Sequence, residues 1–257
     1  MKRRIQILLS LTIALTALVL IVSKKKSTLS HVELTNTIDE DIVLVNLGEA
    51  NREQIAMVLS KIDSCGPKVI GVDVFFFQEK GNFQDSILSQ AFEVLRNDII
   101  AYSFDSAGTI ITSIPKIRNN ASDEGYTDLD DQKGLSSNFV PIIENGNNIY
   151  ESFALRIVRA WKPEFKHTLQ KNKSIPIRFR RTLSQFNFFY SGDFDELDVC
   201  SYLKNKIVLV GYLGPSSEDK HFTPIRFKVK YKEGEPDTYG LVIIANEIRT
   251  ILDFEKK

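Results

Sequence analysis

After a long, mainly apolar run near the amino terminus, the hydrophobic and polar positions of this chain follow two different periods. Short β-branched apolar runs, typical of strands buried on both faces of a sheet, occur at 42–47, 68–77, 99–103 and 206–211. Apolar residues at the 3.6-residue spacing of an amphipathic helix occur at 51–62, 85–95, 152–161 and 241–254. The pattern predicts an α/β fold, a single domain with a mainly parallel central sheet flanked by helices and connected by right-handed crossovers.

The middle of the chain is less regular. Residues 119–138 are rich in Asp, Asn, Ser and Gly, which indicates an extended loop. The aromatic and β-forming residues of 178–181 and 186–190 favour two further strands, and 198–203 a short helix. Arg178, Arg180 and Arg181 fit either an anion-binding patch or the exposed edge of a strand, and we favour the edge.

The first apolar run, Ile5 to Val22, lies between Lys2-Arg3-Arg4 and Lys24-Lys25-Lys26. As a helix it is about 27 Å long, close to the hydrocarbon thickness of a bilayer. A cleaved signal peptide should have a shorter apolar core and a small-residue cleavage site, and a lipoprotein signal needs a cysteine that is absent here. A buried core helix is disfavoured too, so we expect an uncleaved membrane anchor.

The anchor divides the chain into four parts. We expect a cytoplasmic tip at 1–4, a transmembrane anchor at 5–22, a juxtamembrane linker at 23–40 and a globular domain at 41–257. Basic residues flank both ends of the apolar run, but the free amino terminus adds to the charge of the leading segment. The expected orientation is therefore an inside start and an outside domain.

Composition removes one class of function. The chain carries 33 basic and 33 acidic residues and no basic stripe interleaved with aromatic residues, so we expect no nucleic-acid partner. The two cysteines, Cys65 and Cys200, each precede a predicted strand. An oxidising compartment would permit a bridge if those strands are neighbours. Two buried thiols are the interpretation that the sequence favours.

Polar residues gather where the predicted strands end. Asp73 stands at the carboxyl end of a central strand, where open α/β sheets bind their ligands, although an Asp there also commonly caps a loop. Asn46 and Gly211 end two other strands, and a loop after Gly211 is long enough to fold over the same edge. We therefore expect a ligand-binding site formed by Asn46, Asp73, Gly211, Asp219, His221 and Thr223.

Motifs for metal binding or catalysis are missing. No two-histidine spacing suits zinc, and the acidic segment from Asp123 to Asp131 lacks the glycine and closing glutamate of an EF-hand, which favours a solvated loop. No nucleophile elbow or Walker pattern occurs, and neither cysteine has a histidine in supporting context. The expectation is a protein that is not an enzyme and that has no metal and no cofactor.

The order of these segments resembles that of the CHASE2 domain. The resemblance begins at Ile42-Val43-Leu44-Val45 and covers nearly everything after the linker. Its later parts are Lys68-Val69-Ile70-Gly71-Val72-Asp73, Gly125-Tyr126 with Asp130 and Gly134, Ser152-Phe153-Ala154-Leu155, Tyr190-Ser191-Gly192, Lys206 to Gly211, Asp219 to Pro224, and Ala245-Asn246-Glu247-Ile248. The ordered set, rather than any single piece, is what resembles the family.

The resemblance implies an extracytoplasmic sensory domain of a bacterial membrane receptor, which passes a signal through the inner membrane to a cytoplasmic output domain. No second apolar span and no output domain follow the last predicted helix. We therefore expect a single-pass sensor on the periplasmic side that binds an unknown small-molecule signal, acts through a membrane or envelope protein partner and works as a monomer or a homodimer. The alternative is a structural or assembly part of the cell envelope without a small-molecule ligand.

Overall fold

The computed structural model of the chain describes residues 31–254, apart from 132–133, 196–197, 218 and 233. The helices are α2 (Arg52–Ser64), α3 (Asn82–Val94), α4 (Pro115–Arg118), α5 (Phe153–Trp161), α6 (Cys200–Leu203) and α7 (Gly240–Leu252). The strands are β1 (Ile42–Asn46), β2 (Val69–Val72), β3 (Asp98–Phe104), β4 (Ile110–Ile111), β5 (Asp123–Tyr126), β6 (Leu129–Asp131), β7 (Ser136–Phe139), β8 (Ile142–Asn145), β9 (Asn148–Glu151), β10 (Ile175–Pro176), β11 (Asn187–Tyr190), β12 (Ile207–Gly211), β13 (Lys220–His221) and β14 (Thr238–Tyr239).

The central sheet is parallel, as the sequence predicts. Its strands lie in the order β11-β1-β12-β2-β3-β5, and each neighbouring pair in this series is parallel. The short β4 pairs antiparallel with the end of β3. β12 lies between β1 and β2, although it is the last of the three in the chain. The segments before and after β12 are therefore brought into the middle of the sheet.

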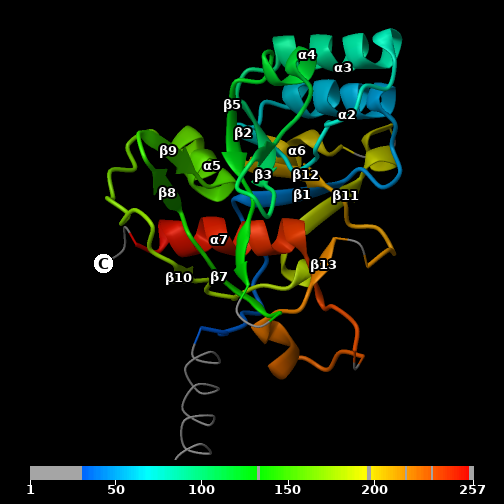
Figure 1. Cartoon of the computed structure of the whole chain (residues 1–257). Coiled ribbons are helices and arrows are strands. Elements are labelled where there is room, and N and C mark those ends of the chain that lie inside the picture. The colour runs from blue at the N-terminus through cyan, green and yellow to red at the C-terminus, as the bar shows by residue number, and fades with distance from the viewer. Residues whose placement is uncertain (1–30, 132–133, 196–197, 218, 233, 255–257) are drawn as a thin grey trace, which may run out of the picture.

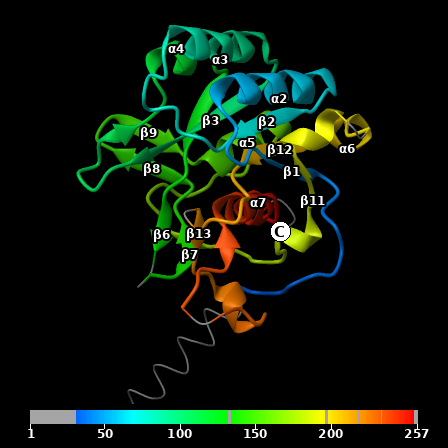
Figure 2. The ribbon, with the colours of Figure 1, turned by 90° about the vertical axis from the view of Figure 1, so that its right-hand side faces the viewer.

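Residues of the buried strands alternate between two hydrophobic cores. Ile42 and Leu44 of β1 pack with α5 and α7 on one face, whereas Val43 and Val45 pack with α2 and α3 on the other. Figure 1 shows the result, with α2, α3 and α4 above the sheet and α7 beneath it, and Figure 2 shows the same layers from the side. The molecule is a three-layer α/β/α domain.

One face carries the helices of the four short connections between parallel strands of the central sheet. The connections β1-α2-β2, β2-α3-β3, β3-α4-β5 and β11-α6-β12 all step across the sheet in the same direction. Since crossovers share one hand, helices that step in the same direction must cover the same face. The opposite face is left to α5 and α7, of which α7 follows the long segment after β12.

The boundary between linker and domain lies earlier than the sequence indicates. Val32 is buried in the core beneath the sheet, and Asp39 is fully buried. Backbone bonds tie this segment to the domain, since Glu33 N–H donates to the carbonyl of Phe179 and Thr35 N–H to that of Arg180. The predicted linker at 23–40 is therefore wrong for its last residues, which belong to the folded domain.

Two further sequence predictions are wrong. Residues 119–138 contain β5, β6 and the start of β7 instead of an extended loop. Their acidic side chains have partners; for example, Asp123 pairs with Arg156. Residues 178–181 are not an edge strand, because Arg178 and Arg180 pair with Asp253 and Arg181 pairs with Asp39. These charges have partners far along the chain, which no local pattern could show.

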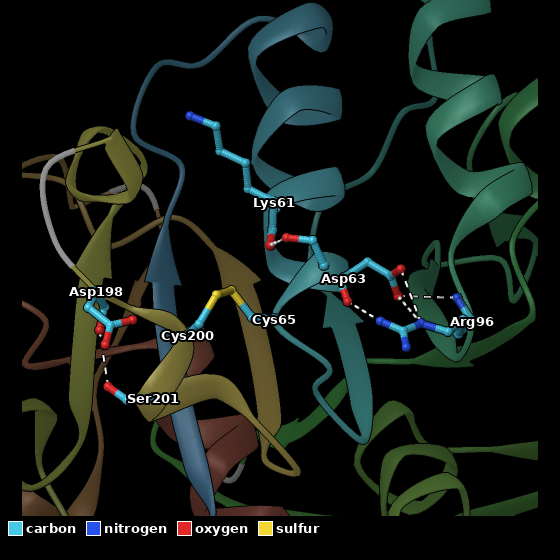
Figure 3. Close-up of a disulfide and its surroundings, with 8 residues drawn as sticks. Lys61, Asp63, Cys65, Arg96, Asp198, Cys200 and Ser201 are labelled. Atoms are coloured by element: carbon cyan, nitrogen blue, oxygen red, sulfur yellow. Dashed lines mark hydrogen bonds and ion pairs between the residues drawn. A yellow bond between two sulfur atoms is a disulfide. The ribbon is translucent and has the colours of Figure 1, made fainter.

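The cysteines form a disulfide, so the prediction of two buried thiols is also wrong. Cys65 follows the last turn of α2 and Cys200 opens α6, with their Cα atoms 4.7 Å apart (Figure 3). The bridge forms because β2 and β12, which follow the two cysteines, are neighbours in the sheet. That strand order was the condition the sequence could not resolve.

Candidate functional site

A cavity of about 580 Å³ opens at the carboxyl edge of the central sheet. The residues that follow β1, β2, β5 and β12 line it, together with the end of β3 and the first turns of α7. Backbone bonds hold the strand ends together, since Leu47 N–H donates to the carbonyl of Gly211 and Asp73 N–H to that of Val210. The volume suits a small-molecule site, and the position is where open parallel sheets bind ligands.

Asp73 lies at the centre of this edge and lines the cavity. Burial and the neighbouring carboxyl of Asp219 raise the pKa of Asp73 to about 7. The space around the adjoining Gly211 is narrow, because a Cβ at this position would lie 3.1 Å from Cδ1 of Leu241 and 3.5 Å from Cβ of Asp73. Glycine at this position therefore lets α7 and the Asp73 side chain approach the strand end.

Asp219 and His221 line the cavity from the segment after β12. Asp219 sits at the start of α7, where a Cβ on Gly240 would lie 2.8 Å from its Oδ1. Burial raises the pKa of Asp219 to about 6, against the opposing effect of the Gly240 N–H. Burial also lowers the pKa of His221, although Asp131 and Asp237 act in the opposite direction. His221 is thus biased toward the neutral imidazole.

Asn46 and Thr223 lie outside the cavity wall and hold its loops in place. The Oδ1 atom of Asn46 accepts bonds from Gly48 N–H at 2.9 Å and from Leu213 N–H at 2.8 Å, which joins the ends of β1 and β12. Thr223 is fully buried and bonds Asp237 through its hydroxyl at 2.6 Å. Of the six predicted site residues, the structure therefore brings Asp73, Gly211, Asp219 and His221 together around the cavity.

Sequence reasoning missed acidic residues on two other elements. Asp128 and Asp131 line the cavity, and Asp128 accepts bonds from the Ser103 hydroxyl at 2.8 Å and from Phe104 N–H. Glu247 lies on α7 beside Asp73 and is only 4% exposed. The signal available for Glu247 was a charged residue inside an otherwise apolar helix. Asp128 and Asp131 belong to the acidic segment that the sequence pattern favoured as a solvated loop, and their position at the cavity depends on β5 lying beside β3.

Comparison with known families decides the relationship of this chain to other proteins. The sequence model of the CHASE2 domain matches residues 12–257, which is essentially the whole chain. The chain belongs to the CHASE2 domain family. CHASE2 domains are extracytoplasmic sensory domains, so the cavity lies in a domain of a sensory class. Neither the curated proteins nor the solved structures gave a significant match.

Membrane attachment of this CHASE2 domain is a prediction that rests on the sequence pattern alone. Within residues 31–254, where the structure describes them, none of the helices combines the length and apolarity needed to cross a bilayer. The predicted anchor at 5–22 and cytoplasmic tip at 1–4 lie outside the described residues. The anchor therefore stays a prediction.

A metal ion requires several donor side chains that lie close together. Among the residues that the structure describes, no three His, Cys, Asp or Glu side chains lie close enough together to hold one. In the cavity, Asp128 is bonded by Ser103 and Phe104, and Asp219 lies against the N-terminus of α7. The arrangement offers carboxyl and imidazole groups around an open space instead of a compact ligand set.

Proposed function

We propose that this CHASE2 domain is a membrane-anchored sensor on the periplasmic side of the bacterial inner membrane, which binds a small molecule in the cavity at the carboxyl edge of its sheet. The observation that carries the proposal is the cavity itself, of about 580 Å³, where four predicted residues meet, two from strand ends and two from the loop after Gly211. Perturbed titratable groups in a cleft are typical of functional sites, and Asp73 is such a group.

Two features support the periplasmic side. Disulfides persist in oxidising compartments and are rare in the cytosol, and Cys65 and Cys200 are bonded. The apolar run at 5–22 has the length of a bilayer span and lies on the amino-terminal side of the domain. A reporter that functions only outside the cytoplasm should therefore be active when it is fused after Lys257, and a reporter that functions only in the cytoplasm should be inactive there. Cytoplasmic activity of the intact fusion would contradict the proposed orientation.

The structure offers a route from the cavity toward the anchor. The first turns of α7 line the cavity through Gly240, Ile243 and Ile244. At the other end of α7, Arg249 bonds Asp39 and Asp41, in the segment that joins the domain to the N-terminal residues. A ligand that displaces α7 would therefore act on the segment that follows the anchor. We propose that a membrane or envelope protein partner receives this change.

Binding without catalysis is the activity that the cavity favours. Ser103 is the serine on its wall, and its hydroxyl bonds Asp128 instead of a histidine. A serine nucleophile needs an adjacent general base held by a third group. We therefore propose that the bound molecule is released without chemical change. Turnover that is abolished by Asp73→Ala or His221→Ala would refute this part of the proposal.

Native mass spectrometry of the full chain, extracted from its producing cells in mild detergent, tests the proposal. We expect extra mass from a retained small molecule. Thr127→Phe fills the cavity wall and should remove that mass, whereas Thr168→Phe, at an exposed loop position, should keep it. Retention that is equal in the two variants would show that the molecule binds elsewhere. A bare chain with a stable protein partner would favour an assembly role instead.

One observation favours the second candidate function, an assembly role in the cell envelope. β11 forms an edge of the central sheet, and two of its side chains are exposed, Phe188 at 37% and Tyr190 at 53%. An edge strand with exposed aromatic residues is a common site for pairing with another chain, which includes a second copy of the same protein. Phe188→Lys should abolish such an assembly without altering the retained small molecule.

A further inference from the structure

The cavity has an unbalanced charge. Asp73, Asp128, Asp131 and Asp219 line it, and among the residues that the structure describes neither a lysine nor an arginine does. His221 is the basic group on the wall, and burial lowers its pKa. The cavity is therefore acidic, although the whole chain has as many basic as acidic residues.

A buried carboxyl without a partner lies next to this wall. Glu247 is 4% exposed and stands on the same face of α7 as Gly240, Ile243 and Ile244, which line the cavity. Burial raises the pKa of Glu247 well above its usual range, and the nearby carboxyl of Asp73 raises it further. Among the described residues, none donates a hydrogen bond to the side chain of Asp73 or Glu247.

Each of the other buried acids in the described part of the chain has an ion-pair or hydrogen-bond partner. Arginines serve three of them, since Asp39 pairs with Arg249 and Arg181, Asp85 with Arg52, and Glu151 with Arg156 and Arg159. Asp98 accepts hydrogen bonds from the backbone and hydroxyl of Ser122. An unpaired carboxylate in an apolar surrounding is strongly unfavourable, so a buried acid needs a proton or a cation. Asp73 and Glu247 lack both an arginine and a hydrogen-bond donor.

We propose that the ligand of this cavity is a small organic cation, with an ammonium or guanidinium group that lies between Asp73 and Glu247 and supplies the positive charge that the described residues do not place there. The inference rests on the proposed function and names the chemical class of its ligand. Ser103, Thr127 and Tyr212 on the wall offer hydroxyl groups for the polar remainder of the molecule, and Ile243 and Ile244 offer an apolar surface.

Cation binding between Asp73 and Glu247 should be accompanied by a measurable release of protons. Without a ligand, Asp73 is largely protonated below about pH 7. A cation favours the ionised form, so the affinity should rise as the pH rises toward 8. The other charged groups that face Asp73 are Asp219 from the segment after β12, Glu247 from α7, and Asp128, Asp131 and His221 across the cavity. Burial raises the pKa of Asp219 and of Glu247, so the ionisation of these two carboxyls strengthens the same trend.

Calorimetric titration of the full chain in detergent tests the ligand class with four probes of equal length. Butylamine and butylguanidine carry the cation, butanol is neutral and butyrate is an anion. We expect heat from the two cations only. Because the buffer takes up the released protons, this heat should differ between buffers of different ionisation enthalpy. Absence of cation binding at about 10 mM, weaker than any useful affinity, would overturn the inference.

Isosteric variants locate the binding. Asp73→Asn and Glu247→Gln should each weaken cation binding about tenfold or more, which corresponds to the loss of one charge contact. Glu93→Gln removes an exposed carboxylate from α3 and should have no effect. The melting temperature of each variant shows whether it is folded. Equal cation affinity in all four proteins would place the cation elsewhere and contradict the inference.

The outcomes also separate this inference from the proposed function. A retained small molecule that proves neutral or anionic by mass and composition would refute the cation class and leave the sensor intact. A chain that retains no molecule, binds no probe and copurifies with a stable protein partner would contradict both.

Discussion

Reduction of the disulfide between Cys65 and Cys200 should strongly destabilise the domain. The bridge joins residues 135 apart in the sequence, between the end of α2 and the start of α6. In the chain-entropy model, a loop of that length removes about 5 kcal/mol of conformational freedom from the unfolded state. Native disulfides that have been removed from other proteins cost about 2–5 kcal/mol, so we expect a loss within that range.

The expected loss converts into observable shifts. For a domain of this size, 1 kcal/mol changes the melting temperature by about 2–4 °C, so reduction should lower it by roughly 10 °C. Because the cross-link acts mainly on the unfolded state, its removal should also increase the dependence of the unfolding free energy on urea. A reduced chain unfolds to a more extended ensemble and exposes more surface.

Fluorescence of Trp161, the only tryptophan, can follow urea unfolding of the oxidised and reduced protein. The double variant Cys65→Ala/Cys200→Ala should match the reduced protein and should not respond to reductant. Alanine is the suitable replacement because Cys65 is 8% exposed in the core between α2 and the sheet. If mass analysis shows two free thiols and the urea midpoint stays unchanged, the loop-entropy argument fails for this protein.

Three other substitutions test the remaining physical arguments. Arg249→Met leaves Asp39 buried with Arg181 as its remaining partner and should cost about 3 kcal/mol in urea unfolding, whereas a neutral result would mean that the pair contributes little. Gly125→Ala places a Cβ 2.6 Å from the Cα of Phe153, so it should cost about 3 kcal/mol, while Gly192→Ala, which meets open space, should have little effect. The folded pKa of Asp73, about 7, is above its unfolded value, so its contribution to stability is present below about pH 4 and is lost as the pH rises through 7. Asp73→Asn should therefore be more stable than the natural protein at pH 8 by on the order of 4 kcal/mol, with a difference that vanishes near pH 4. A difference that does not change with pH would refute the burial argument.

Local patterns predicted the elements of the fold well, because each buried strand and amphipathic helix is encoded by consecutive residues. The runs at 42–47 and 206–211 contain β1 and β12, and the helix predicted at 241–254 corresponds to α7, which begins one residue earlier. The order of strands in the sheet depends instead on contacts between distant residues. The insertion of β12 between β1 and β2 decided the disulfide, and no spacing in the sequence shows it.

The same distinction applies to the site. Asp73, Gly211, Asp219 and His221 could be placed together because the carboxyl ends of parallel strands share one edge, whatever the strand order. Asp131 reaches the site from β6, in a separate small sheet, and Glu247 reaches it from α7, so only the folded structure assigns them. Asn46 was expected to touch a ligand because it ends β1, but its side chain instead joins two strand ends.

Three stabilising contacts lie at the opposite edge of the central sheet from the unpaired carboxyls of Asp73 and Glu247. The disulfide, the Asp39–Arg249 pair and the Asp63–Arg96 pair all lie near the amino ends of its strands, and Figure 3 shows two of the three. Asp73 and Glu247 lie toward the carboxyl edge, where ionisation without a counter-charge lowers stability. A fold that is cross-linked at one edge can tolerate unpaired charge at the other, since the total stability and not each local contact decides folding. Substitutions around the cavity should therefore alter binding while the domain stays folded, which is the separation that a sensor needs.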